Sequence, residues 1–579
     1  MSAHDGKIDR NSRKYFDARR SALIKERSSF ISHYKDLSQF IQPRRGRFIA
    51  TDRNIGTPRH QNIINSRATW ALRVARAGMF AGVMSPARPW FRLETNDPGL
   101  MEFQPVILWL DQVEEAMRGI LIQGNLYNMS PVLLGELLLF GTGCMLHVDD
   151  HDDVARFFTQ TVGSYMIAQN DRFDVTTLVR EYQQTVNQLV SEFGLDKVTT
   201  AVKTAYNAGN YEQWFDVVHF IEPNPNFDPK KLNSEFKRFR SVKYQPASND
   251  GEKKFLSKKG FDRFPAYCPR WDVTGEDVYG TNCPAMESLG DIKQLQMEEK
   301  RKAQGIAKMV NPPLKGPASL KNSPISAVPG GVTLFDGGQG NETLGPLYQV
   351  NPQLNELTAD IQRVEKRIED NFFVDMFLAI SNMEGIQPKN QLELSQRQAE
   401  KLLQLGPVLE RVNGEFLDKM IDRLFEQMVE REMLPPAPEE LQGQPLVVRF
   451  ISSLAQAQKS VATGDIDRLA GYVTGLVKGG YEQVLDKFDA DQSVDLYQRL
   501  VGAPAQLIVP DESVAATREA RQEKLQQQQN IQLALEAAKV GGGVLKDLGA
   551  TDLEGDNVAS RTAGALQNVA GESAGNQNQ

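Results

Sequence analysis

The chain has 579 residues, 40% of them hydrophobic, which is enough for several domains with packed cores. A net charge of −8 argues against a protein that grips nucleic acid mainly by neutralising phosphates. No apolar run approaches the ~18 residues of a membrane span, and the polar N-terminus MSAHDGKIDRNSRKYF does not resemble a signal peptide. We therefore expect a protein that is made and assembled in a cytoplasm without a membrane partner.

Four helices are predicted at the start of the chain. The first covers 11–41, where apolar residues recur at helical spacing until Pro43 ends the pattern. Its opposite face is basic, but acidic residues interleave there, so we interpret it as solvated rather than as a nucleic-acid surface. The second and third helices cover about 61–83 and 105–122. Ser130 and Pro131 are typical of the N-cap and first turn of a fourth.

Between Gly141 and Val273 the pattern is mixed, which indicates an α+β body. CMLHV, RFFTQT and SYMIAQ have the composition of strands, and FDVVHFIEPN and KFLSKKGF return to strands and turns. The segment DVTTLVREYQQTVNQLVSEF between them is predicted to be a helix. With the long helices on either side, the fold class is α+β and predominantly α-helical.

Two helices are predicted around a segment rich in Gly and Pro. The first covers 285–309 and ends before Asn311, and the segment 311–350 is expected to form loops and short strands. Asn351 and Pro352 open the second helix, whose apolar residues alternate three and four apart. About 30 residues at ~1.5 Å each would make a rod of ~45 Å.

The rest of the chain is predicted to be helical with several breaks. EGIQPKN (Glu384 to Asn390) interrupts the pattern, and a long helix follows over about 392–433, where we expect Gly406 and Pro407 to cause a bend of more than ~20°. A proline-rich connector leads to short helices over 449–500 and a last helix over 511–540. From Gly541 onward the composition predicts a disordered tail.

We find no pattern for catalysis or for cofactor or metal binding. The chain lacks G-x-x-x-x-G-K-[ST], H-E-x-x-H and G-x-S-x-G. Carboxylates gather at Asp149 to Asp153, but a calcium loop would need a glycine and a distal glutamate, so a solvated turn is favoured. Cys144, Cys268 and Cys283 have no C-x-x-C partner and are interpreted as buried apolar thiols.

The most informative stretch runs from Phe264 to Gly305. It contains Gly275, Glu276, Tyr279, Gly280 and Pro284 in a G-E-x-x-Y-G-x-x-x-P run, followed by a D-I-K-x-L helix. Glycines and a proline set a tight turn, so its role is architectural. The run resembles portal, or head-to-tail connector, proteins of short-tailed bacteriophages. SPARPWFRL, GTGCMLHV and LGPVLERV extend the resemblance in order over roughly residues 10–500.

The resemblance implies a portal fold with wing, stem, clip and crown. The loop at 384–390 would be the tunnel loop, with Gln387, Lys389 and Asn390 as candidates to face DNA, although Lys389 could equally be an ordinary exposed lysine. The implied domains are 1–284, N-terminal helices and wing; 285–310, first stem helix; 311–350, clip; 351–381, second stem helix; 382–391, tunnel loop; 392–433, long kinked helix; 434–510, C-terminal part of the wing; 511–540, crown-like helix; and 541–579, disordered tail.

The function implied by the resemblance is structural. Twelve copies would form a ring at one capsid vertex of the virion, through which double-stranded DNA enters and leaves. The implied partners are the terminase large subunit, tail or adaptor proteins, and the major capsid and scaffolding proteins. Two alternatives stay open: a metal-dependent enzyme acting on nucleic acid through Asp149–Asp153, and a coiled-coil scaffold without a pore. We expect no enzymatic activity and no cofactor.

Overall fold

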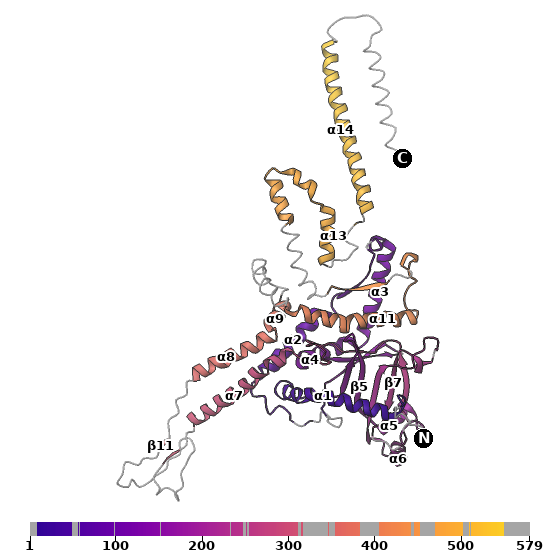
Figure 1. The fold of residues 1–579 in the computed structure, drawn as a ribbon. Coiled ribbons are helices and arrows are strands. Elements are labelled where there is room, and N and C mark those ends of the chain that lie inside the picture. Colours follow the sequence, from indigo (N-terminus) through magenta and orange to yellow (C-terminus); the bar gives the residue numbers. More distant parts are fainter. Residues whose placement is uncertain are drawn as a thin grey trace, which may run out of the picture. The chain divides into compact units, whose positions relative to one another are not determined.

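The computed structural model of the chain contains two compact units, Met1–Gly502 and Ala503–Gln579. Figure 1 shows the fold coloured along the sequence. Among the described residues no helix is long and apolar enough to cross a membrane. The residues that the structure describes are 9–48, 56, 58–97, 99–150, 152–231, 233–246, 250–251, 254–310, 314–315, 345–346, 354–382, 404–441, 445–451, 469–501, 509 and 511–548.

The four predicted N-terminal helices are present as α1 (Arg13–Ile41), α2 (Arg67–Met84), α3 (Gln104–Gln123) and α4 (Leu126–Phe140). Ser12 caps α1, because its hydroxyl accepts a hydrogen bond from the Tyr15 N–H. α1 contributes to two cores. Phe16 and Leu23 pack on the large sheet, whereas residues nearer its C-terminus join the main core between the helices.

The prediction that Ser130 and Pro131 begin a helix is wrong. Both lie inside α4, whose N-cap residue is Asn125, and the Ser130 hydroxyl donates to the Leu126 carbonyl. Pro131 removes one helical hydrogen bond, but the C-terminal half of α4 is buried on every side. The apolar burial of that half offsets the lost bond, so tertiary packing overrides the local signal.

A five-stranded antiparallel sheet forms the centre of the α+β body. Its order is β4 (Tyr165–Gln169), β5 (Val175–Thr185), β6 (Trp214–Pro223), β7 (Phe239–Tyr244) and β8 (Ser257–Phe261). α1 covers one face through a core that includes Phe220 and Val242. The short helices α5 (Val186–Phe193) and α6 (Thr200–Asn207) pack near one end of the opposite face, against Val217.

The helix predicted over 174–193 is therefore wrong for its first half. Val175–Thr185 is strand β5, which pairs along its length with β4 and β6. The segment is rich in β-branched residues, which favour strands, and its two partners satisfy the backbone. The helix begins only after Thr185, where a capping box with Gln188 starts α5.

Two smaller sheets connect distant parts of the chain. β2 (Cys144–Asp150) lies between β3 (Val154–Gln160) and the two-residue β9 (Ala266–Tyr267). β1 (Phe91–Thr95) pairs antiparallel with β12 (Leu446–Phe450). Sequence analysis missed β12, because its partner lies more than 350 positions earlier and leaves no local signal. Helical segments follow at 469–478, η7 (Glu482–Lys487) and α13 (Ala490–Val501).

α7 (Pro284–Val310) and α8 (Leu354–Asn371) confirm the two predicted helices and lie side by side (Figure 1). Arg367 joins them through an ion pair with Asp291, with an Nη2–Oδ1 distance of 2.8 Å. Of the intervening segment, the structure describes only β10 (Leu314–Lys315) and β11 (Gly345–Pro346), which pair antiparallel.

The single rod predicted over 351–381 is wrong, because the helix breaks at its C-terminal end. α8 ends at Asn371, Phe373 has a φ of +55°, and a separate helix, α9 (Val374–Asn382), begins after it. The break lets Phe372, Val374 and Phe377 enter the main core, and the Phe377 ring packs against Gly78 of α2. Burial of these side chains outweighs the local preference for one helix.

The predicted long helix is helical throughout its described part, residues 404–430, which includes Gly406 and Pro407. Residues 392–403, which precede Gly406 and Pro407 in the predicted helix, lie outside the described part. A bend at Gly406 and Pro407 relative to that segment therefore stays a prediction. An irregularity that we did not predict occurs at Asn413–Leu417, which forms a π-helical turn before α11 (Asp418–Glu430). In the second unit, α14 (Asp511–Leu548) confirms the last helix but continues through the glycines at 541–543, so the predicted end at residue 540 is wrong.

Candidate functional site

The run that sequence analysis singled out forms a compact connection between the body and α7, which we call the connecting turn (residues 270–284). Gly275 has a φ of +59°, in the left-handed region that glycine adopts most easily. The Thr281 N–H donates to the Asp272 carbonyl at 2.9 Å and closes the turn. Pro284 is the first residue of α7, where its missing N–H removes no helical hydrogen bond.

The connecting turn packs directly on the GTGCMLHV motif. Gly141, with a φ of +72°, ends α4, and its carbonyl accepts a hydrogen bond from the Trp271 N–H at 2.9 Å. The Gly280 N–H donates to the Thr142 hydroxyl at 2.8 Å. The two motifs lie more than 120 positions apart in the sequence and thus form one junction. Glycine residues allow the two backbone segments to approach closely there.

Tyr279 and Glu276 join the connecting turn to strand β4. The Tyr279 side chain is buried, and its hydroxyl accepts from the Ile167 N–H at 3.1 Å. Burial raises the pKa of the Tyr279 phenol above its usual value, so the hydroxyl is neutral at physiological pH. The Glu276 backbone carbonyl accepts from the Gln169 side-chain amide at 2.6 Å, whereas the Glu276 side chain lies at the surface.

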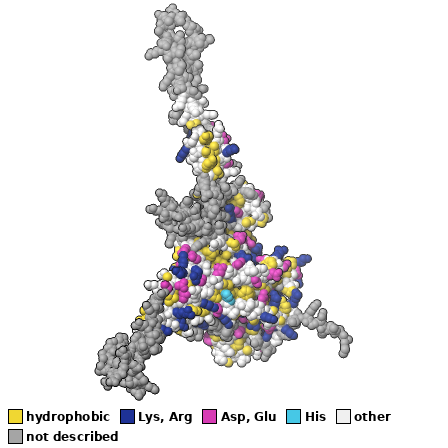
Figure 2. Space-filling model, turned by 60° about the vertical axis from the view of Figure 1, so that its left-hand side comes forward, with side chains coloured by type: hydrophobic (Ala, Val, Ile, Leu, Met, Phe, Trp, Pro, Cys, Tyr) yellow, Lys and Arg dark blue, Asp and Glu magenta, His cyan; other side chains and the backbone are white. Residues whose placement is uncertain are grey.

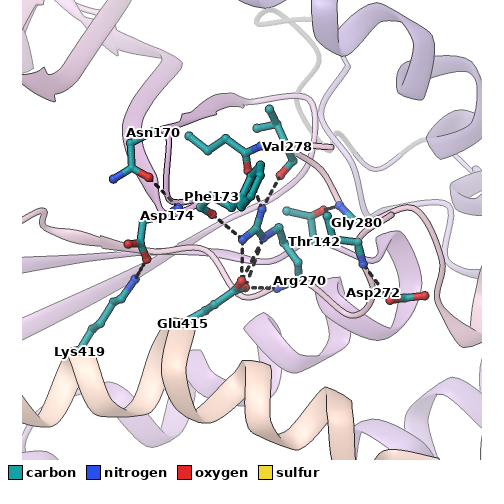
Figure 3. Close-up of polar contacts among 12 residues, drawn as sticks. Thr142, Asn170, Phe173, Asp174, Arg270, Asp272, Val278, Gly280, Glu415 and Lys419 are labelled. Carbon is teal, nitrogen blue, oxygen red and sulfur yellow. Dashed lines mark hydrogen bonds and ion pairs between the residues drawn. The ribbon is translucent and has the colours of Figure 1, made fainter. Parts of the chain in front are cut away.

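Arg270 lies at the centre of this region, and sequence analysis did not identify it. Its guanidinium forms a forked ion pair with the Glu415 carboxylate, with an Nη2–Oε1 distance of 2.6 Å and an Nε–Oε1 distance of 3.1 Å (Figure 3). The same carboxylate accepts from the Arg270 backbone N–H at 2.8 Å. The remaining guanidinium donors reach the side chain of Gln169 and the carbonyls of Phe173 and Val278.

We call Arg270, Glu415, Gln169, Phe173 and Val278 the Arg270 junction. It joins the connecting turn, the β4–β5 turn and the helix that contains Glu415 (Figure 3). Glu415 lies within the π-helical turn, whose extra residue shifts the positions of side chains on the helix. Because Arg270 is only 4% exposed, its charge is stable there only with these partners.

A second and weaker connection runs beside the Arg270 junction. Lys419, one turn after Glu415, forms an ion pair with Asp174 at 3.0 Å, and both side chains are about half-exposed. The Asn170 side chain accepts from the Asp174 N–H and holds the strand turn in place (Figure 3). An exposed pair of this kind contributes little, so the buried Arg270–Glu415 pair is the specific link.

The residues proposed to face DNA cannot be placed. Gln387, Lys389 and Asn390 lie outside the described residues. The structure describes α9 before this segment and helical backbone from residue 404 after it. The assignment of a tunnel loop to the residues between them stays a prediction.

The acidic cluster at Asp149 to Asp153 forms polar contacts within the protein. Asp149 accepts from Arg423 at 3.1 Å and also from the Gln427 side chain, while Asp150 accepts from the N–H groups of Asp152 and Asp153. His151 lies outside the described residues. Within the described part of the chain, no group of three or more His, Cys, Asp or Glu side chains could hold a metal ion.

The three cysteines are free thiols in the interior, as predicted. Cys144 on β2 and Cys268 are close enough to interact, and burial raises the pKa of the Cys144 thiol well above its usual value. Burial likewise raises the pKa of the Cys283 thiol to about 12. The thiols of Cys144 and Cys283 are therefore protonated and poorly nucleophilic at neutral pH.

Charged side chains of both signs are mixed on the face of the molecule that Figure 2 shows. Figure 2 shows basic and acidic residues interspersed on the visible face rather than gathered into a patch of one sign. Many of them form ion pairs, including Arg263 with Asp422 and Lys237 with Asp262. This arrangement agrees with the net charge of −8 and offers no broad phosphate-binding surface on that face.

Comparison with known proteins gives a consistent result. The family described as bacteriophage head to tail connecting protein matches residues 13–509. A "Portal protein" of Salmonella phage epsilon15 is 42% identical over 545 residues, which cover 94% of this chain and 97% of that protein. A "Probable portal protein" of Bordetella phage BPP-1 is 44% identical over 538 residues, covering 92% and 96% respectively. The matched region includes the connecting turn and Glu415.

Proposed function

We propose that this chain, which belongs to the family of bacteriophage head-to-tail connecting proteins and is a portal protein, assembles as a closed ring of twelve copies at one capsid vertex. The observation that carries the proposal is the match to two portal proteins over more than 90% of each chain. A closed ring requires two different complementary faces on each subunit. The ring would be the conduit for double-stranded DNA during packaging and ejection.

The partners of the ring follow from this role. The terminase large subunit would dock during packaging and supply the work of translocation by ATP hydrolysis. Tail or adaptor proteins would replace it later, and the major capsid and scaffolding proteins would surround the ring. The chain would be assembled in the cytoplasm of the bacterial host and remain in the virion. In this account it has no enzymatic activity of its own and needs no cofactor.

The helical elements support specific roles within the ring. α7 and α8 would form the stem, because they are long, lie side by side and are joined by the Arg367–Asp291 pair. The segment 311–350 between them would be the clip that docks the motor and the tail. α14 is a long helix in a separate unit and would contribute to a crown.

The Arg270 junction would transmit position between the body and the DNA channel. Glu415 lies on the helix that follows the proposed tunnel loop, and Arg270 holds it against the turn that starts α7. A buried, forked ion pair fixes both distance and orientation. A displacement of the connecting turn, the β4–β5 turn or the helix that contains Glu415 would then displace the other two. Such coupling suits a ring that must bind different partners before and after packaging.

The two alternative functions receive no specific support. For a metal-dependent enzyme, the carboxylate of Asp149 would have to be available, but it is paired with Arg423 and Gln427. For a coiled-coil scaffold, the body should be a small part of the chain, but sheets and short helices occupy most of residues 91–283.

Electron microscopy of the negatively stained full-length protein tests the proposal. End-on views should show rings with a central, stain-filled channel, and class averages should give the rotational symmetry. Elongated rods without a channel would support the scaffold instead. Cleavage of DNA by the purified protein in Mg²⁺ that Asp149→Asn abolishes would support the enzyme.

A further inference from the structure

A groove of about 710 Å³ lies on the face of the five-stranded sheet that α1 does not cover. The sheet forms its floor, and α11 and strand β2 contribute the opposite wall through Arg423, Glu426 and Asp149. We call it the sheet groove. Its volume falls in the range of ~300–1,000 Å³ that is typical of small-molecule sites.

A row of polar side chains crosses the floor of the sheet groove. Arg180, His219, Lys243 and Ser257 occupy directly paired positions on β5, β6, β7 and β8, so their side chains lie on the same face. All four line the groove. Partly buried polar side chains are unfavourable unless they have hydrogen-bond or ionic partners. The side chains in this row that lack a charged partner are therefore the ones available to a ligand.

His219 holds Arg180 in place. The Arg180 Nε–H donates to His219 Nδ1 at 3.0 Å, so His219 Nε2 carries the proton and donates to the Ser241 hydroxyl at 2.8 Å. Burial and the neighbouring Arg180 and Lys243 charges lower the pKa of His219 well below its usual value, which keeps the ring neutral and able to accept. The guanidinium also stacks on the Tyr182 ring, 4.6 Å from its centroid.

Arg180 is therefore oriented but not neutralised by an ion pair among the described residues. Two exposed lysines that line the groove, Lys197 and Lys259, likewise form no ion pair among the described residues. Lys243 differs, because it pairs with Glu192 at 2.6 Å. Glu192 also lines the groove and interacts electrostatically with Arg180, but its hydrogen-bonded partners are Lys243 and Gln184. Arg180, Lys197 and Lys259 are thus three groove cations that form no ion pair in the described structure and are available to an added anion.

Arg423 supplies a second and independent observation. Its side chain is 8% exposed, and its Nη1 atom is buried with no hydrogen-bond partner in the described structure. Its Nη2 donates to Asp149 at 3.1 Å. A buried donor without an acceptor is unfavourable, and an added acceptor in the groove that this residue lines would satisfy it.

Other lining residues limit what the ligand can be. Phe158 is 43% exposed at the groove, and Phe193 and Phe261 also line it, so an apolar or aromatic part could be covered. Glu426 and Glu430 on α11 could accept hydrogen bonds from amino groups. A simple polyanion would be repelled by these carboxylates, whereas a small molecule with one anionic end would not.

We propose that the sheet groove binds a small molecule that carries a phosphate group, with the phosphate held by Arg180, Lys259 and Lys197. Arginine offers a planar fork that matches phosphate oxygens, and the flanking lysines add point charges. The shared chemistry is a phosphate at the sheet side, whether it is inorganic phosphate or a phosphomonoester. The site is internal to one subunit, so the proposal does not rest on ring assembly.

Isothermal titration calorimetry of the full-length protein with inorganic phosphate and with adenosine 5′-monophosphate tests the proposal. We expect saturable binding of one ligand per chain at constant ionic strength. Tighter binding of the monophosphate would show that the organic part enters the groove, and equal affinities would show that phosphate alone is the ligand. No saturable heat with either probe up to about 10 mM, a concentration that detects even weak binding, would overturn the proposal.

Neighbouring residues of one strand provide a matched control. Lys259 lines the groove, whereas Lys258 is the adjacent residue, lies on the opposite face of the sheet and is placed over the Phe255 ring. Lys259→Gln should weaken phosphate binding several-fold, and Arg180→Gln should weaken it about tenfold or more, because a charged donor is lost. Lys258→Gln should leave it unchanged, and equal weakening by Lys258→Gln and Lys259→Gln would contradict the site.

Folding of the variants must be checked separately. Circular dichroism and thermal unfolding should be unchanged in Lys259→Gln and in the double variant Lys197→Gln/Lys259→Gln, since both lysines are exposed. If Arg180→Gln does not fold, the double variant still decides the question. Wild-type affinity for phosphate in a folded double variant would overturn the assignment of the phosphate to the sheet side of the groove.

Discussion

Arg270 and Glu415 are 145 positions apart in the chain, yet their side chains form a forked ion pair in which only 5% of the arginine side chain is exposed. The pair links the turn that starts α7 to the π-helical turn before α11. Geometry of this kind is specific, because the buried guanidinium has lost its water and depends on the carboxylate, whose side chain is only 20% exposed.

Glu415→Gln should strongly destabilise the protein. The substitution leaves a buried guanidinium beside a neutral amide, and breaking a buried pair in this way typically costs about 3–5 kcal/mol. We expect the midpoint of chemical denaturation to fall accordingly. The control is Asp174→Asn, which removes the half-exposed pair with Lys419 and should change stability by less than about 1 kcal/mol. Equal effects of the two substitutions would show that the buried pair has no special role.

Gly280→Ala should prevent the connecting turn from packing on the GTGCMLHV motif. A Cβ at position 280 would lie 2.0 Å from the Gly141 carbonyl oxygen, which is backbone and cannot rotate away. We expect a lower melting temperature or loss of soluble protein. Gly290→Ala is the matched control, because it lies in α7 with open space around it and should stabilise the helix by roughly 0.5–1 kcal/mol. A neutral Gly280→Ala would contradict the predicted clash.

The stability of the body should fall as the pH rises from about 4.5 to about 7. Burial raises the pKa of Glu136 to about 7, and Arg45, the Val162 N–H and the Thr161 hydroxyl offset this only in part. The folded state therefore binds an extra proton between the usual carboxyl pKa and about 7. Its stabilising effect is fully present at acid pH and is lost as the pH rises through the folded value.

The expected loss from Glu136 is on the order of 3 kcal/mol across this window. Denaturation at a series of pH values between 5 and 8 measures it. Glu136→Gln should flatten the slope, but a residual slope should remain because burial also raises the pKa of Glu114 to about 7. A slope unchanged by Glu136→Gln would show that this carboxyl does not titrate in the window.

Lys389→Ala should leave ring assembly intact and alter the amount of DNA packaged or retained. If twelve copies of Lys389 surround DNA, each forms a weak and salt-dependent contact with phosphates. In vitro packaging with mutant rings at several ionic strengths measures the effect. Packaging and retention equal to wild type at every salt concentration would make Lys389 an ordinary surface lysine.

The sequence predicted most helices correctly because their signals are local. α1 follows from the spacing of Phe16, Leu23 and Tyr34, and α7 follows from a proline at its start and a change of composition at its end. The errors occur where contacts between residues far apart in the sequence determine the secondary structure. Val175–Thr185 has a pattern compatible with a helix, but strands on both sides make it β5, and burial of Phe372 and Phe377 breaks the rod after α8.

The candidate site was predictable only in part. The glycines of the connecting turn could be identified because positive φ angles and close approach require glycine. Arg270 and Glu415 could not, because one arginine and one glutamate 145 positions apart give no periodic signal. The cross-strand row of the sheet groove is equally hidden, since it depends on the register of four strands and one of them was predicted to be a helix.

The mass of the assembled protein tests the central claim most directly. Native mass spectrometry of the full-length chain over a range of concentrations should show one dominant species of about 776 kDa, because twelve chains of 64.7 kDa sum to that value. Detection of only monomers and dimers at all concentrations would contradict the proposed ring.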